Sequence, residues 1–193
     1  KFCVIDLMDA IYIKEKYPFA RVLLLGVFDE TQIYIYQRYD IEISINDLSD
    51  LDFLNISNLK VQLKINSGMN RYGISPEDIG RVLSIIDDKK LTLMGIYSHN
   101  ATSNLRTIKE QKEAFFYAVK CVKNIDIHYA ASGLMDDDFS IFNCKRIGAN
   151  IYKDSLSVYG KIVKINYVFK DEYIGYDYSY KMENDGYIGI IDI

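Results

Sequence analysis

Charged and polar residues that could do chemistry recur at the ends of four successive strand-like segments of the chain. They are Lys64 and Arg71, then His99, then Ser132, then Arg146 with Gly148. In a parallel βα barrel the carboxyl ends of the strands share one rim, and catalytic residues from several strands meet there. The recurrence therefore favours a functional site at such a rim.

Each of these residues also has an ordinary structural explanation when it is taken singly. Arg71 in a loop is compatible with a solvated side chain, and His99 at the end of an apolar strand is compatible with a satisfied core histidine. Arg146 and Gly148 are compatible with a simple strand-to-turn transition. The joint pattern, rather than any single residue, favours function.

The elements that would position these side chains alternate between strand-like and helix-like segments, which is typical of parallel βα units. Strands are predicted at Phe2–Ile5, Arg21–Leu25, Ile41–Ile45, Leu59–Asn66, Leu91–Tyr97 and Ile125–Ala130, with a further one around Cys144–Ile147. Helices are predicted at Leu7–Lys16, Glu30–Arg38 and Thr107–Lys123, and another begins at Pro76 after a capping Ser75. The sequence therefore predicts an α/β fold with a parallel, TIM-type barrel.

The strand Leu59–Asn66 has one apolar and one polar face, because its residues alternate in character. The polar residues are Lys60, Gln62, Lys64 and Asn66. In a barrel, the polar face near the carboxyl end of a strand can point into the site. Lys64 is therefore expected to point inward.

After Tyr152 the pattern of the chain changes. Three β-rich runs, Leu156–Val168, Tyr173–Met182 and Tyr187–Ile193, follow each other without a helical period. We expect residues 1–152 to form a partial barrel and residues 153–193 to start a mostly antiparallel β domain. A full βα barrel needs about 250 residues, so at least one strand and one helix are expected upstream of Lys1.

The composition excludes several classes of function. A net charge of -4 and a pI near 5.2 argue against a nucleic-acid partner. No apolar run reaches the roughly 20 residues of a membrane-spanning helix, and no leader opens the chain, so a cytoplasmic protein without a membrane partner is predicted. The three cysteines are scattered, without the spacing of metal ligands, so no metal site is expected.

The segment Leu63–Ile74 resembles the arginine loop of alanine racemases, the pyridoxal-phosphate enzymes with a barrel domain followed by a β domain. The resemblance implies that Arg71 contacts the phenolic oxygen of the cofactor. It also implies that Lys64 can be carbamylated. Carbamylation would turn a cation beside Arg71 into an anion and remove a like-charge repulsion.

Two further segments resemble strands that carry cofactor-binding residues in the same family. Met94–Thr102 is similar to the strand that ends in a histidine lying against the pyridine ring, here His99. Ile127–Ser132 is similar to the strand whose serine, here Ser132, binds the cofactor phosphate. Ala131 departs from the asparagine that is usual before that serine, which puts one minor polar contact in doubt.

The segment Arg146–Tyr152 resembles the family's arginine-glycine segment. There the arginine faces the pyridine nitrogen, and the backbone amides that follow, here those of Gly148 and Ala149, hold phosphate. An arginine cannot take a proton from the ring nitrogen as an aspartate can, so the ring stays neutral, which suits racemisation.

The segment Gly175–Tyr180 resembles the start of the β-domain strand that supplies a catalytic tyrosine. Tyr176 is the matching position and is implied to be the base on one face of the substrate. In the family this tyrosine reaches the site of the partner subunit, so the resemblance implies a homodimer with shared active sites.

The resemblance implies a pyridoxal 5'-phosphate-dependent alanine racemase that supplies D-alanine to the cell wall, with this chain as a fragment lacking both termini. No lysine of the chain matches the cofactor-binding lysine of the family, so we expect the 193-residue chain alone to be inactive. Two alternatives remain open. They are a serine or broad-specificity amino-acid racemase, and a catalytically dead barrel fragment that binds the cofactor weakly.

Overall fold

The structure, a computed structural model, describes residues 1–100, 105–120, 122–129, 143–148, 151–152, 155, 157 and 159–192. The chain divides into two compact units, Lys1–Asn150 and Ile151–Ile193, and each unit is described by itself. In these residues, no helix has both the length and the apolar character needed to cross a membrane.

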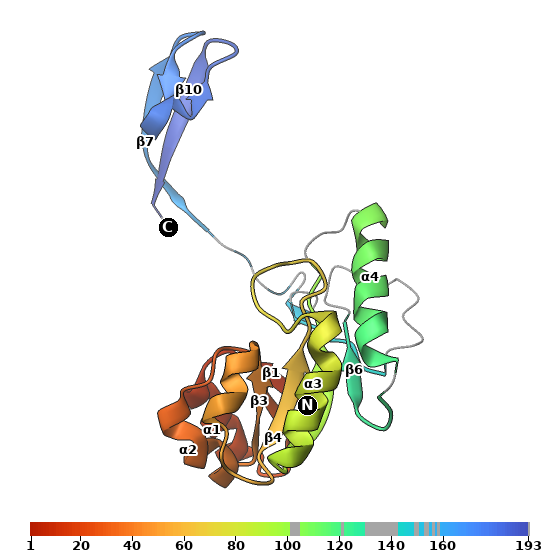
Figure 1. Ribbon diagram of the computed structural model, residues 1–193. Coiled ribbons are helices and arrows are strands. Elements are labelled where there is room, and N and C mark those ends of the chain that lie inside the picture. The colour runs from red at the N-terminus through yellow and green to blue at the C-terminus, as the bar shows by residue number, and fades with distance from the viewer. Residues whose placement is uncertain are drawn as a thin grey trace. The chain divides into compact units, whose positions relative to one another are not determined.

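A curled sheet of six parallel strands organises the described part of the first unit (Figure 1). The strands pair in the order of the sequence: β1 Phe2–Val4, β2 Val22–Leu24, β3 Ile41–Ile45, β4 Lys60–Lys64, β5 Thr92–Tyr97 and β6 Asp126–His128. The helices are α1 Leu7–Lys16, α2 Ile33–Arg38, α3 Ile79–Asp88 and α4 Leu105–Val119, with 3-10 segments at Glu30–Gln32, Leu48–Phe53 and Pro76–Asp78. This arrangement is an incomplete parallel βα barrel, so the predicted fold class is confirmed for this unit.

Alternation along each strand separates an outer apolar face from an inner polar one. On β4, Val61 and Leu63 belong to the hydrophobic core, to which α3 contributes Val82. Between them in the sequence, Gln62 and Lys64 point to the opposite face and are buried as well. The interior of the half-barrel is therefore lined by buried polar side chains, and these are the groups available for a site.

Two predicted elements of the first unit differ from the structure. Ser75 stands before the helix and its hydroxyl donates to the Glu77 carboxylate, but its oxygen accepts from no backbone N–H, so it does not cap the helix. Around Cys144 the described residues form an isolated parallel bridge with His128 and no strand. A single β-bridge does not make a strand, so the prediction of a seventh strand around Cys144–Ile147 is wrong.

The second unit contains antiparallel β structure, as predicted. Strand β7, Lys161–Val168, pairs with β10, Gly186–Asp192, in a long hairpin. Strand β8, Tyr173–Ile174, pairs with β9, Tyr180–Lys181. The fold class predicted for this part of the chain is confirmed.

The β-rich run Tyr173–Met182 contains both β8 and β9, and a 3-10 turn at Tyr176–Tyr178 separates the two strands. Gly175 enters the turn with a φ of 82°, and Asp177 and Tyr178 follow with φ values of 55° and 52°. Positive φ values do not continue a strand, so the chain reverses here. The turn, rather than a strand, carries Tyr176.

Two glycines of the first unit differ in what an added methyl group would meet. Gly73 has a φ of 126°, and a Cβ there would lie 2.5 Å from the Asn66 N. Gly80, in α3, has no atom within 4 Å of the same position. We expect Gly73→Ala to lower the free energy of unfolding by about 1–3 kcal/mol and Gly80→Ala to raise it by about 0.5–1 kcal/mol. Urea denaturation of the two variants checks this, and equal effects would contradict the backbone described at Gly73.

Candidate functional site

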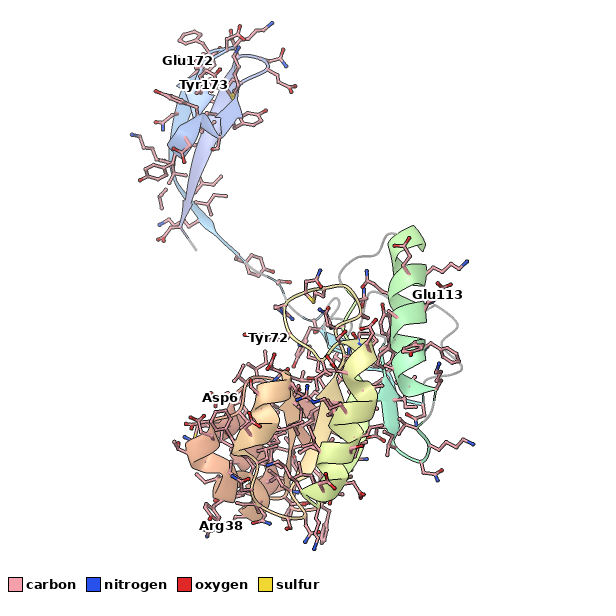
Figure 2. All side chains as sticks on the ribbon, viewed as in Figure 1. Asp6, Arg38, Tyr72, Glu113, Glu172 and Tyr173 are labelled. Atoms are coloured by element: carbon pink, nitrogen blue, oxygen red, sulfur yellow. The ribbon has the colours of Figure 1, made fainter. Side chains whose placement is uncertain are left out.

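One end of the sheet gathers the residues that follow its strands. Figure 2 shows Asp6, which follows β1, and Tyr72, in the loop after β4, toward this end, and Arg38, which ends α2, at the opposite end. The Nζ of Lys64, the last residue of β4, lies 5.1 Å from the centre of the Tyr72 ring. Lys64 is only 7% exposed and Tyr72 is 49% exposed, so this cation–π contact joins a buried cation to a ring that partly faces solvent.

Hydrogen bonds to two asparagines hold the loop that carries Arg71. The side-chain oxygen of Asn66 accepts from the backbone N–H groups of Gly68 and Asn70, at 3.1 and 3.0 Å. The N–H of Gly73 donates to the carbonyl oxygen of Asn46, at 2.8 Å, and so ties the end of the loop to the residue after β3. The loop is therefore anchored at both ends, with Arg71 between the anchors.

Lys64, Arg71, His99 and Arg146 form a set of basic side chains, which we call the basic cluster; the charges of Arg71 and Arg146 act on both Lys64 and His99. Burial lowers the pKa of Lys64, and the charges of Arg71 and Arg146 lower it further. Burial also lowers the pKa of His99, and the other charges of the cluster add to this effect, that of Arg146 most. In the described part of the chain no carboxylate contributes to either shift, so the basic cluster suits an anion.

The Arg146 guanidinium is held by neutral acceptors. Its Nη1 donates to the Nδ1 and the carbonyl oxygen of His128, at 2.5 and 3.1 Å. Its Nη2 donates to the carbonyl oxygens of Ser98 and Tyr129, at 2.5 and 3.2 Å. The Cζ also lies 5.3 Å from the centre of the Tyr97 ring. These bonds engage the four terminal N–H groups and leave the Nε–H, for which the described residues offer no acceptor.

His128 connects Arg146 to the interior of the half-barrel. Its ring stacks on that of Tyr97, with 5.0 Å between the centroids and 2° between the planes. Its Nε2 lies 2.8 Å from the Oε1 of Gln62. Burial, followed by the charge of Arg146, lowers the pKa of His128 to about 2. The imidazole is therefore neutral near pH 7 and can accept a hydrogen bond from the arginine.

Sequence reasoning did not single out His128 and Gln62, which hold this arrangement together. The alternation of Leu59–Asn66 marked Gln62 as part of a polar face, and the position of His128 near the end of a predicted strand was visible too. Neither signal shows that the two side chains meet, because they come from strands that do not pair with each other.

The remaining predicted site residues are not part of the described cluster. Ser132 and Ala149 lie outside the described residues. Gly148 is an exposed residue two positions after Arg146. Tyr176 belongs to the second unit and is 96% exposed. The described residues contain no group of three or more His, Cys, Asp and Glu side chains that could hold a metal ion.

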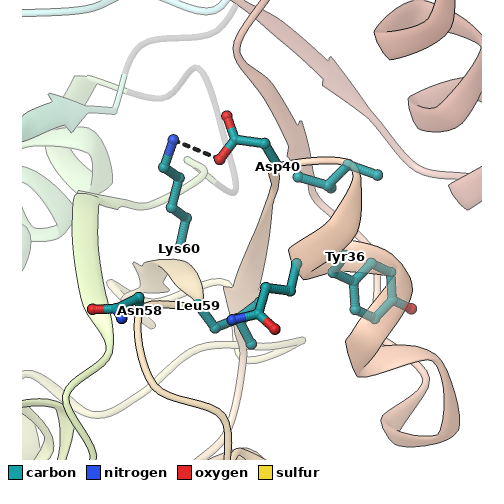
Figure 3. A pocket seen from close by; sticks show the side chains of 7 residues that line it. Tyr36, Asp40, Asn58, Leu59 and Lys60 are labelled. Atoms are coloured by element: carbon teal, nitrogen blue, oxygen red, sulfur yellow. Dashed lines mark ion pairs between the residues drawn. The ribbon is translucent and has the colours of Figure 1, made fainter. Parts of the chain in front are cut away.

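A small hollow lies at the amino ends of β3 and β4, away from the basic cluster (Figure 3). Its volume is about 20 Å³, room for a single water molecule. Asp40 and Lys60 form an ion pair of 2.6 Å on its lining. Because it is this small and faces the end of the sheet opposite the predicted rim, it is not the functional site.

Comparison with known proteins points to one family. Residues 1–156 match the family model described as "Alanine racemase, N-terminal domain". The chain is 27% identical over its whole length to an alanine racemase of Fusobacterium nucleatum and 28% identical to one of Borreliella burgdorferi, and it spans 60% of the length of each.

Solved structures give the same fold. The alanine racemase from E. faecalis superposes with a TM-score of 0.71 at 22% identity, over 100% of this chain and 60% of that one. A histidine racemase from Leuconostoc mesenteroides superposes with a TM-score of 0.69 at 19% identity, again over 100% of this chain and 60% of its own. The chain thus spans about 60% of the proteins that it resembles.

The low pKa of His128 makes the stability of the fold dependent on pH. Below the ordinary value of 6.5 and above about 2, the unfolded chain binds a proton that the folded chain does not, so stability falls as the pH drops. We expect the free energy of unfolding to decrease between pH 6.5 and 5, with a contribution from His128 of up to about 1.4 kcal/mol per pH unit. Urea denaturation at several pH values measures the slope.

The variant His128→Asn should lose the contribution of His128 to this slope, and the matched variant His99→Asn should lose a smaller part, because the lowered pKa of His99 acts in the same direction. A slope that is the same in the wild type and in His128→Asn would show that His128 does not stay neutral in the folded state.

Proposed function

Because the chain belongs to the alanine racemase family, whose N-terminal domain model matches residues 1–156, we propose that it is part of a pyridoxal-phosphate-dependent enzyme that interconverts L- and D-alanine. Residues 1–152 would form the cofactor-binding part of the barrel, and residues 153–193 the start of the β domain. The relatives named alanine racemase support alanine as the substrate, and supply of D-alanine to the cell wall is the corresponding role.

The basic cluster is the observation that carries this proposal. Pyridoxal phosphate is an anion with a phosphate, a phenolic oxygen and a ring nitrogen that accepts hydrogen bonds. Lys64, Arg71, His99 and Arg146 converge without a carboxylate among the described groups that act on Lys64 and His99. Such a set fits this cofactor, because an anion between the cations would relieve the repulsion among them.

Arg146 would hold the ring nitrogen. Its terminal N–H groups are engaged within the protein, so among the contacts of the described residues the Nε–H remains to donate to a ligand. Arginine does not give up its proton, so a ring nitrogen bound to it would accept a hydrogen bond and stay unprotonated. When bound, the cofactor would draw electron density from the substrate's α-carbon, and an unprotonated ring draws less.

The other residues would bind and orient the cofactor. Arg71 would donate to the phenolic oxygen and His99 would lie against the ring. Ser132 and the backbone amides of Gly148 and Ala149 would hold the phosphate.

Tyr176 would move a proton at the α-carbon on one face of the substrate. Its side chain is almost fully exposed on its own unit, which supports a role toward another chain. A cytoplasmic homodimer in which Tyr176 serves the partner's site is the assembly that we propose.

A second candidate function is racemisation of a different amino-acid substrate by the same fold. The histidine racemase from Leuconostoc mesenteroides shares the fold at a TM-score of 0.69, so the fold is not restricted to one side chain. Exchange of the α-hydrogen in deuterium oxide, by a protein that contains this chain, separates the alternatives. We expect exchange with alanine to be at least about tenfold faster than with serine or histidine, since one or two extra groups in a fitted pocket cost about 1–3 kcal/mol. Equal rates would favour a broad-specificity racemase.

Removal of an arginine from the basic cluster should weaken cofactor binding. We expect Arg71→Ala and Arg146→Gln each to reduce the affinity of the chain for pyridoxal phosphate by about tenfold or more, because a charged hydrogen bond contributes about 1.5–3 kcal/mol. A titration followed by cofactor absorbance measures this. Arg81→Ala removes an exposed arginine of α3 and is the matched control. If all three variants bind as the wild type does, the basic cluster is not the cofactor site.

Lys64 should react with carbon dioxide. Its lowered pKa favours the neutral amine, whose nitrogen bonds to the carbon of carbon dioxide and then loses a proton, leaving a carbamate anion beside Arg71. With 13C-labelled bicarbonate, we expect one carbamate signal in the 13C spectrum. Lys64→Ala should abolish the signal and Lys60→Ala should retain it. A spectrum that is unchanged in Lys64→Ala would rule out carbamylation at this position.

A further inference from the structure

A line of hydrogen bonds runs from Arg146 through the interior of the half-barrel to a carboxylate. Arg146 Nη1 meets His128 Nδ1, and His128 Nε2 lies 2.8 Å from Gln62 Oε1. The Gln62 Nε2 donates to the Glu42 Oε2. Gln62 and Glu42 are 0% and 1% exposed and His128 is 2% exposed. The line joins β6, β4 and β3, and beyond the partly buried Arg146 it lies among buried groups.

The two ends of this line give it a single direction. The guanidinium of Arg146 can only donate, and the ionised carboxylate of Glu42 can only accept. The amide of Gln62 must therefore turn its NH₂ group to Glu42 and its oxygen to His128. His128 must then carry its proton on Nε2, which leaves the Nδ1 lone pair for Arg146.

Glu42 is itself held by cations. Its Oε1 accepts from the Arg21 Nε at 2.6 Å, and its Oε2 lies 3.2 Å from the Lys1 Nζ. Asp126 pairs with the same two cations, at 2.8 Å from Arg21 Nη2 and 3.0 Å from Lys1 Nζ, but the structure gives it no contact with Gln62. Glu42 is thus the one carboxylate of this ion cluster, among the described residues, that continues into the hydrogen-bonded line.

We propose that Glu42 and Gln62 are positioning residues for Arg146, because together they set the tautomer of His128. A carboxylate at position 42 prevents the Gln62 amide from turning over. A reversed amide would present NH₂ to His128 Nε2, favour the Nδ1–H tautomer, and place that proton against the donating Nη1 of Arg146. The guanidinium would then lose one of the acceptors that fix its orientation. The effect on cofactor binding rests on the proposed function, whereas the tautomer does not.

The tautomer can be measured on the chain without cofactor. His99 and His128 are its only histidines, so 15N-histidine labelling gives two imidazoles, which His99→Asn assigns. We expect His128 to show a protonated Nε2 and a bare Nδ1 in the wild type at pH 7. In Glu42→Gln, whose side chain can turn either way, a second population with a protonated Nδ1 should appear.

Three further variants serve as controls for the tautomer measurement. The double variant Glu42→Gln with Gln62→Glu keeps an acceptor-only group against His128 and should restore the wild-type tautomer. Asp126→Asn alters the same ion cluster outside the line and should leave the tautomer unchanged. Gln62→Lys puts a donor-only group against His128, should shift it to Nδ1–H, and serves as the test if Glu42→Gln does not fold. A single Nε2–H tautomer in every folded variant overturns the proposal.

A titration with pyridoxal phosphate connects the tautomer to the site. We expect Glu42→Gln to bind about tenfold more weakly than the wild type, and the double variant and Asp126→Asn to bind as the wild type does. A changed tautomer with unchanged affinity would overturn the positioning role of the pair. If the wild-type chain binds no pyridoxal phosphate, the proposed function fails, while the spectra still decide whether Glu42 and Gln62 set the tautomer.

Discussion

The orientation of the Arg146 guanidinium is the constraint on which the rest of the site depends. A mostly buried cation is unfavourable unless it is well hydrogen-bonded. Here the guanidinium donates to three backbone carbonyl oxygens and one imidazole nitrogen, at 2.5 to 3.2 Å. None of these acceptors carries a full charge. The carboxylate at the far end of the hydrogen-bonded line, Glu42, lies farther inside, beyond His128 and Gln62, and is paired with Arg21 and Lys1. The arrangement holds the arginine in place and leaves its positive charge available at the carboxyl end of the sheet.

The parallel sheet explains why the arrangement lies inside the half-barrel. Strand alternation sends every second side chain inward, and the carboxyl ends of the strands share one end of the sheet. Lys64 and Tyr97 are paired positions at the ends of β4 and β5, and Tyr97 is paired with His128 on β6. Three strands therefore deliver their last inward residues to the same level, where Arg146 and the loop with Arg71 join them. Under the proposed function, repulsion among Lys64, Arg71 and Arg146 would be relieved by an anion, which could be the cofactor or a carbamate on Lys64.

The fold class and the end of the sheet that carries the basic cluster could be predicted from the sequence. Cations after successive strands indicated the carboxyl end of the sheet, and the alternation of Leu59–Asn66 indicated that Lys64 points inward. The partners of Arg146 could not be predicted, because they depend on the register that brings His128 level with Tyr97 and on a bridge between His128 and Cys144. The turn at Tyr176 could not be predicted, because a tyrosine-rich run has the composition of a strand. Its residue types do not indicate the positive φ values of Asp177 and Tyr178.

The 15N spectrum of ring-labelled pyridoxal phosphate bound to the chain tests the proposed role of Arg146 most directly. We expect a ring nitrogen that is unprotonated near pH 7 and hydrogen-bonded to Arg146, with a chemical shift that changes in Arg146→Lys. A protonated ring nitrogen, or a shift that is the same in the wild type and in Arg146→Lys, would contradict the assignment of Arg146 to the ring nitrogen.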